Sequence, residues 1–138
     1  LCQNLCHSWP LKEPDVTKLT SELLDAVGDA FNANDIDAVM QYFAPDATFD
    51  HAIGPDAHGV RFEGADAIRG VFAGLFDKVE NVHWETLDCA VTESKAYCEY
   101  RRTARHKDGT TEEYLSVDIL TYEDGLIVHK DTYYKQRT

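Results

Sequence analysis

The stretch RRTARHKDGTTEEYLSVDILTYEDGLIVHK, residues 101–130, holds the pattern that decides the fold. Two turn sequences, Asp108-Gly109 and Glu123-Asp124-Gly125, separate long segments that are rich in Tyr, Thr and Val. An Asp-Gly pair between such segments is a strong hairpin signal, and β-branched and aromatic residues favour strands. The pattern predicts a meander of long antiparallel strands over residues 82–91, 95–105, 111–122 and 126–135.

The part of the chain before this meander predicts helices. Apolar residues recur at helical spacing from Leu19 to Phe31, and a second short apolar stripe over residues 36–43 stops before Pro45. A third helix follows Gly64, and short strands are expected over residues 47–53 and 60–62. Helices gathered before the long strands favour an α+β class. Because a strongly twisted meander can curl around three helices, we expect a cone-shaped barrel of a curved, mainly antiparallel sheet with a pocket at its mouth.

Length and composition favour one domain and exclude several partners. The chain has 138 residues, 43% of them apolar, which suits a single domain over residues 17–138. Residues 1–16 show no clean periodicity, so we expect an extension or an expression-derived tail there. A net charge of −12 argues against nucleic acid and anionic membranes as partners.

Location and cysteine chemistry are also predicted from composition. No apolar run approaches the roughly 18–20 residues that span a bilayer, and we expect a cytoplasmic protein. The four cysteines are expected to be free thiols, with Cys89 and Cys98 as small strand residues, because a chain with this much core does not need them as staples.

Three ionisable residues are candidates for chemistry. Asp118 lies mid-strand in Leu115-Ser116-Val117-Asp118-Ile119-Leu120, where a carboxylate is either exposed or tuned by its surroundings. His51 sits on a short strand beside the helices, where an imidazole can act as an acid or a base near neutral pH. His83 precedes Trp84, an aromatic residue that suits either a pocket wall or the core.

The hairpin register decides which charges meet Asp118. If Asp108-Gly109 is a two-residue turn, Glu99 lies opposite Asp118 and Arg101 lies opposite Ser116. One added bulge residue would instead place Arg102 on that face.

No cofactor or metal is expected. The chain has no Gly-rich phosphate loop after a strand and no Gly-x-Ser-x-Gly elbow. A metal site is weakly supported, because the spacing of the candidate ligands His51, His83, His129 and Asp131 is not compact.

The order of several short motifs matches a known family. They are Ala-Phe-Asn-Ala-Asn-Asp-Ile-Asp at 30–37, Phe-Ala-Pro-Asp-Ala-Thr-Phe at 43–49, Gly-Ala-Asp-Ala-Ile-Arg at 64–69, Val-Asp-Ile at 117–119 and Asp-Gly-Leu-Ile at 124–127. In this order and spacing the chain resembles the SnoaL-like and ketosteroid-isomerase-like branch of the nuclear transport factor 2-like superfamily, with its cystatin-like fold. The resemblance covers about residues 19–134.

The resemblance implies roles for the candidates. In ketosteroid isomerase the position matching His51 holds the carboxylate base, and the position matching Asp118 holds the aspartic acid that donates to the oxyanion. The tyrosine that completes that oxyanion hole falls at Val27, so steroid isomerase activity is not expected. His83 beside Trp84 is similar to the arrangement in scytalone dehydratase.

The leading hypothesis is therefore a cofactor-independent isomerase, cyclase or dehydratase that acts on a small, largely apolar carbonyl or hydroxy compound. His51 would be the general base and Asp118 the acid or oxyanion donor, with His83 and Tyr114 assisting. The residues expected to bind substrate are Trp84, Tyr114, Glu99, Arg101, Phe72, Val27, Leu120 and Tyr134.

Two other hypotheses remain open. One is epoxide hydrolysis, in which Asp118 would activate water with Arg101 or Arg102 and Asp131 nearby. The other is a non-catalytic ligand-binding or dimerisation module, since a fold alone does not fix a function. If Leu115, Val117 and Ile119 form the outer sheet face, a homodimer is the simplest way to cover them.

Overall fold

The computed structural model describes residues 19–138 as helices followed by a large sheet. The predicted tail over residues 1–16, with Cys2 and Cys6, lies outside the described residues. The elements are α2 (Ser21–Asn32), α3 (Ile36–Met40), β1 (Phe43–Asp56), β2 (Gly59–Glu63), α4 (Ala65–Lys78), β3 (Val79–Val91), β4 (Lys95–His106), β5 (Thr111–Glu123) and β6 (Leu126–Tyr134). No helix among these is long and apolar enough to cross a membrane.

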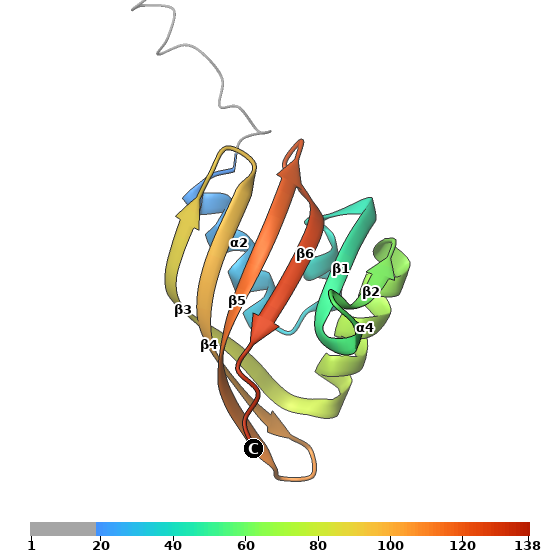
Figure 1. Ribbon diagram of the computed structural model, residues 1–138. Helices are drawn as coiled ribbons and strands as arrows, with labels where there is room; N and C mark the ends of the chain where they lie inside the picture. The colour runs from blue at the N-terminus through green and yellow to red at the C-terminus, as the bar shows by residue number, and fades with distance from the viewer. Residues whose placement is uncertain (1–18) are drawn as a thin grey trace, which may run out of the picture.

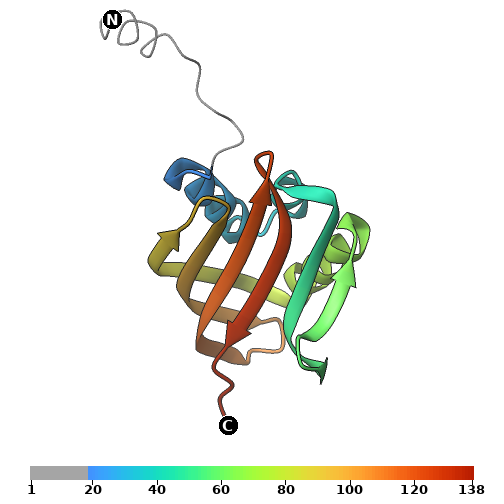
Figure 2. The ribbon, with the colours of Figure 1, turned by 45° about the horizontal axis from the view of Figure 1, so that its top comes forward.

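The six strands form one curved sheet in the order β2-β1-β6-β5-β4-β3. All neighbours are antiparallel except β1 and β6, which are parallel. The sheet bends around the helices, which lie on its concave side (Figures 1 and 2). The predicted α+β class and mainly antiparallel sheet are confirmed, although the sheet stays open instead of closing into a barrel.

The core between the helices and the concave face is built from aromatic rings. Phe31 on α2 contacts Phe72 on α4 edge-on, with ring centroids 5.1 Å apart. Phe72 in turn stacks on Phe49 of β1 at 5.2 Å. Each of these rings is less than 10% exposed. Since aromatic rings bury a large apolar area, this cluster fixes how α2 and α4 sit against the sheet.

Two asparagines join the end of α2 to the free edge of β3. The side-chain amide of Asn32 accepts from the Trp84 N–H at 2.8 Å and donates to the Trp84 carbonyl at 3.1 Å. Asn34, with a positive φ of 54°, makes the equivalent pair of bonds to Val82. These amides replace a neighbouring strand for the edge of β3, because they satisfy its backbone groups. They also fix Trp84 on the concave side.

The hairpin between β4 and β5 has a longer loop than the simplest two-residue turn. Arg105 pairs with Thr111, so Cys98 lies opposite Asp118 and Arg102 lies opposite Tyr114. The register with Glu99 opposite Asp118 is therefore wrong by one residue. The alternative register, in which Arg102 faces inward, is the one that the loop length produces.

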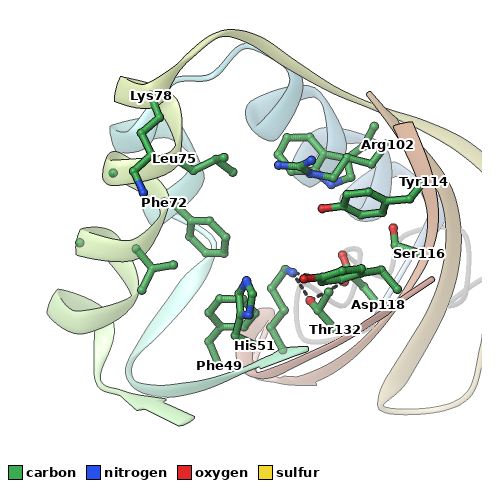
Figure 3. Close-up of a pocket in the computed structure, with 16 residues that line it drawn as sticks. Phe49, His51, Phe72, Leu75, Lys78, Arg102, Tyr114, Ser116, Asp118 and Thr132 are labelled. Atoms are coloured by element: carbon green, nitrogen blue, oxygen red, sulfur yellow. Dashed lines mark hydrogen bonds and ion pairs between the residues drawn. The ribbon is translucent and has the colours of Figure 1, made fainter. Parts of the chain in front are cut away.

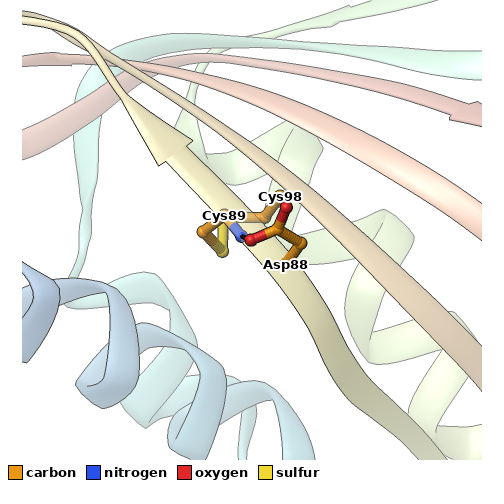
Figure 4. The surroundings of a disulfide bond; sticks show 3 residues. All are labelled: Asp88, Cys89 and Cys98. Carbon is orange, nitrogen blue, oxygen red and sulfur yellow. Dashed lines mark hydrogen bonds between the residues drawn. A yellow bond between two sulfur atoms is a disulfide. The ribbon is translucent and has the colours of Figure 1, made fainter.

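Cys89 and Cys98 lie directly opposite each other on β3 and β4, with Cα atoms 4.2 Å apart. Their sulfur atoms are joined by a disulfide (Figure 4). The expectation of free thiols is wrong for this pair. The reason is the register, because residues opposed across two antiparallel strands come close enough for a disulfide.

Candidate functional site

A cavity of about 440 Å³ opens between α4 and the concave face of the sheet. Figure 3 shows Phe72 and Leu75 of α4 on one side of it, and Arg102, Tyr114 and Ser116 of the long strands on the other. A much smaller cavity, of about 30 Å³, lies toward α2. The main cavity is lined by Phe49, His51, Gly70, Val71, Phe72, Gly74, Leu75, Lys78, Trp84, Arg102, Tyr114, Ser116, Asp118, Lys130, Thr132 and Tyr134.

The centre of the site is a buried ion pair between β5 and β6. Lys130 Nζ lies 3.2 Å from Asp118 Oδ1, and both side chains are about nine-tenths buried. Thr132 donates its hydroxyl to the same Oδ1 at 2.7 Å, and Lys130 also donates to the Thr132 Oγ1 at 2.7 Å. Because Asp118 Oδ1 receives both donors, the carboxylate is an acceptor here. The side-chain hydrogen bonds that Asp118 accepts from the described residues end on Oδ1, so Oδ2 is the oxygen left to accept a proton.

The Lys130 ammonium is also surrounded by phenyl rings. Nζ lies 4.7 Å from the ring centroid of Phe49 and 5.6 Å from that of Phe72. An ammonium over an aromatic face is attracted by the ring quadrupole, and this attraction is strongest away from water. The rings and Asp118 together hold the Lys130 ammonium at the floor of the cavity. Asp118 and Lys130 line both cavities.

His51 reaches the cavity from β1. Its Nδ1 accepts the backbone N–H of Ile53 at 3.2 Å, so a neutral ring carries its proton on Nε2. Burial lowers the pKa of the His51 imidazole, and the nearby Lys130 and Arg102 lower that pKa further. The β1–β2 turn requires Gly59, with φ +83°, because a Cβ there would overlap the His51 carbonyl. The hydrogen bond from Ile53 and the lowered pKa together make His51 a neutral ring with an N–H donor at Nε2.

Arg102 projects from β4 between two rings. Its guanidinium carbon lies 5.0 Å from the ring centroid of Tyr114 and 5.8 Å from that of Trp84. Tyr114 stacks on Tyr134 with centroids 4.6 Å apart, and burial raises the pKa of Tyr114 to about 12. Tyr114 therefore keeps its proton at neutral pH, so its hydroxyl can donate or accept a hydrogen bond but does not act as a base.

The predicted site residues divide into three groups. His51, Asp118, Trp84, Phe72, Tyr114 and Tyr134 all line the main cavity. Val27 and Leu120 line the small neighbouring cavity. His83, Glu99 and Arg101 are exposed and line neither cavity. His83 faces outward because its neighbours Val82 and Trp84 take the two inward positions of β3, and Glu99 and Arg101 face outward because of the one-residue register difference.

A second cluster of ionisable residues lies where β1 pairs with β6. Asp50, His129 and Asp131 bring ligand-type atoms within 4.8 Å of one another. Asp50 is 3% exposed, and Arg61 binds both of its carboxylate oxygens at 2.7 and 2.8 Å. These hydrogen bonds hold the pKa of Asp50 below its ordinary range. Because the guanidinium already occupies the carboxylate, the geometry favours an ion-pair cluster over a metal site.

Three functional candidates were missing from the sequence-based set: Lys130, Thr132 and Ser116. Lys130 lies in Leu126-Ile127-Val128-His129-Lys130, where a lysine ordinarily indicates a surface position. Alternation along β6 was the available signal, because Val128, Lys130 and Thr132 occupy one face of that strand.

The comparisons with known proteins agree with this architecture. The family model of the SnoaL-like domain matches residues 24–130. A comparison with curated proteins found no match.

Three solved structures share the fold. A protein with a ketosteroid isomerase-like fold from Catenulispora acidiphila, in complex with trimethylamine, is 24% identical, with a TM-score of 0.73 over 85% of this chain and 88% of that one. A candidate polyketide cyclase from Xanthomonas campestris is 23% identical, with a TM-score of 0.67 over 83% and 89%. Another, from Sinorhizobium meliloti, is 23% identical, with a TM-score of 0.67 over 82% and 94%.

These likenesses show that this chain has the same fold as the three proteins. Since the family model covers most of the chain, this protein belongs to the SnoaL-like domain family.

Proposed function

We propose that this protein is a cofactor-independent enzyme that moves a proton on a small carbonyl compound bound in the main cavity. The observation that carries the proposal is the buried Asp118–Lys130 pair at the floor of that cavity. It combines a carboxylate oxygen that can accept a proton with an ammonium that can stabilise negative charge. Both groups lie away from bulk water, where electrostatic interactions are stronger.

The geometry favours a division of roles opposite to the one expected from sequence. Asp118 Oδ2 would act as the general base, since Oδ1 is already occupied by Thr132 and Lys130. His51 would act as a donor, since its Nδ1 is occupied by the Ile53 N–H. His83 takes no part, because its side chain is exposed outside the cavity.

The proposed step begins at a carbon beside a carbonyl. Asp118 removes the proton, the C–H electrons form a C=C bond, and the carbonyl electrons move to oxygen. The resulting enolate oxygen accepts hydrogen bonds from His51 Nε2–H and the Lys130 ammonium. Where a C=C bond adjoins the deprotonated carbon, Asp118 returns the proton to the far carbon of the dienolate, which completes an isomerisation. In a cyclisation, the enolate carbon attacks a second carbonyl of the same molecule, and the alkoxide that forms takes the proton from Asp118. The names of the two candidate polyketide cyclases favour this class.

The geometry does not favour the epoxide hydrolase alternative. That reaction was expected to use Asp118, an arginine and Asp131 together. Arg102 does line the cavity with Asp118. Asp131, however, pairs with Ile119 and lies with Asp50 and His129, on the other face of the sheet. Asp131 therefore does not lie beside Asp118 and Arg102, as the epoxide hydrolase alternative requires.

Deuterium exchange tests the proposed proton transfer. We expect the wild-type protein to speed exchange of the acidic C–H protons of 2-tetralone into D₂O by about 10²–10⁴-fold over buffer, measured by NMR. The rate should hold as the pH is lowered to 6.5, because the lowered pKa of His51 favours the neutral ring and the Nε2–H donor is present in the neutral and in the protonated ring. Exchange no faster than in buffer, for this ketone and for a panel of cyclic and aromatic ketones, would contradict the proposal.

A homodimer through the outer sheet face is the partner we propose. Val117 and Ile119 lie opposite Tyr133 and Tyr97, which are 57% and 39% exposed. Exposed apolar side chains grouped on a sheet face favour association with a second copy. Light scattering at about 50 µM should give twice the 15.6 kDa chain mass, and Val117→Asp should give a monomer. A monomeric wild-type protein at that concentration would refute the dimer.

The cytoplasmic location expected from the sequence stays a prediction. The Cys89–Cys98 disulfide counts against it, because disulfides are rare in the cytosol of most organisms.

A further inference from the structure

The net charge of the side chains that line the main cavity is opposite in sign to the net charge of the whole chain. Among the described residues, three cations line it, Lys78, Arg102 and Lys130, against one carboxylate, Asp118. Lys130 and Asp118 offset each other as an ion pair. Arg102 pairs loosely with Glu112, which does not line the cavity, so Arg102 and Lys78 give the lining itself a positive balance in a chain of net charge −12. A cationic cavity in an acidic protein selects for an anionic ligand.

Of the two cations Arg102 and Lys78, Arg102 is the buried one, and its Nη1 nitrogen lacks a hydrogen-bond partner. The residue is 8% exposed, and its Nη1 atom is buried with no hydrogen-bond partner in the described chain. The nearest carboxylate oxygen, Glu112 Oε1, lies 3.5 Å from Nη1 and is already bound to His106 Nε2 at 2.6 Å. An unsatisfied buried donor is costly. Because Arg102 lines the cavity and Glu112 engages it only at 3.5 Å, an acid group of a ligand in the cavity would give the guanidinium a closer counter-charge.

The neighbours of Arg102 favour a flat ligand. Trp84 and Tyr114 lie against the guanidinium, and Tyr134 stacks behind Tyr114. Planar groups pack best against such faces, through offset stacking.

The α4 wall leaves open space for the body of that ligand. Gly70 and Gly74 line the cavity one helical turn apart, and a Cβ added at either would meet nothing within 4 Å. Glycine in a helix interior costs about 1 kcal/mol relative to alanine, and no close packing requires it here. Two glycines on the cavity side of α4 therefore widen the cavity.

We propose that the substrate is a flat organic acid, ionised at neutral pH, whose acid group binds the Arg102 guanidinium from the cavity side and whose conjugated or aromatic body lies against the glycine face of α4. This names the substrate class of the proposed enzyme and rests on the same cavity. Lys78, on the same helix, adds to the attraction of an anion. Neutral compounds of the same shape lack this charge pairing with Arg102 and bind more weakly.

Calorimetry with two isosteric probes tests the acid subsite. The full chain should bind 2-naphthoate about 10- to 100-fold more tightly than neutral 2-naphthamide, as expected for a hydrogen bond to a charged group. Arg102→Met should remove this preference by weakening only the acid. Arg101→Met, one residue away on the exposed face, should leave both affinities unchanged. Gly74→Leu should weaken both probes, and it keeps the test available if Arg102→Met fails to fold.

Several results would overturn the subsite. The proposal of an anionic ligand is wrong if the wild-type protein binds the two probes with equal affinity. It is also wrong if 2-naphthoate does not bind at millimolar concentration. If Arg102→Met weakens the binding of both probes equally, Arg102 only shapes the cavity and does not bind the acid group. Unchanged binding in Gly74→Leu removes the proposed position of the ligand body. Because binding is measured without turnover, these results are distinct from the failure of ketone exchange, which would remove the proposed proton transfer alone.

Discussion

Asp118→Asn is expected to lower the rate of ketone deuterium exchange by about 10²–10⁴-fold. An amide has nearly the shape of a carboxylate but cannot accept a proton at neutral pH. The amide oxygen of the substituted side chain can still accept the hydrogen bonds from Thr132 and Lys130, so the ammonium keeps an acceptor although it loses its counter-charge. The loss should appear in kcat with little change in KM, because proton transfer fails while the cavity still binds the ketone. Exchange rates over a range of ketone concentrations measure both.

Asp131→Asn is the matched control for this substitution. It makes the same chemical change on β6, but Asp131 lies with Asp50 and His129 on the other face of the sheet, so the exchange rate should not change. His51→Gln, which keeps an N–H donor, should retain more activity than His51→Leu. Wild-type kcat in Asp118→Asn, with a folded protein, would show that the base lies elsewhere.

The elements of this fold could be predicted from local sequence. Turn residues and periodicity depend on near neighbours in the chain, so the strands expected over 95–105 and 111–122 correspond closely to Lys95–His106 and Thr111–Glu123. The inward position of Asp118 follows from the same local pattern, because Leu120 and Tyr122 continue its face into the core. The apolar Leu115, Val117 and Ile119 made that face ambiguous until the register was known.

The site required information that alternation alone does not contain. The length of one loop decides whether Arg101 or Arg102 enters the cavity, since a one-residue shift exchanges the two faces of a strand. Parallel pairing of β1 with β6 joins segments about eighty residues apart and brings Phe49 against Lys130. No local pattern marks such a pairing, which is why a lysine in an apolar strand was not recognised as the partner of Asp118.

Lys130→Met is expected to lower the free energy of unfolding by about 3–5 kcal/mol. Removing the ammonium leaves a carboxylate that is 11% exposed, with Thr132 as its one remaining donor among the described residues. A buried charge without its partner costs more than the pair contributes, because the charge has lost both water and counter-ion. Urea unfolding at pH 7.5 measures the difference.

The double variant Lys130→Met/Asp118→Asn separates charge from packing. If the loss in Lys130→Met comes from the orphaned carboxylate, removing that charge should recover most of the stability, and the two substitutions should be strongly non-additive. A double variant as unstable as the single one would instead assign the loss to the packing of the lysine methylenes among Phe31, Phe49 and Phe72. Lys130 would then stabilise the protein mainly by packing in the aromatic core. Its position at the floor of the cavity would be weaker support for a role of its charge in binding a developing enolate.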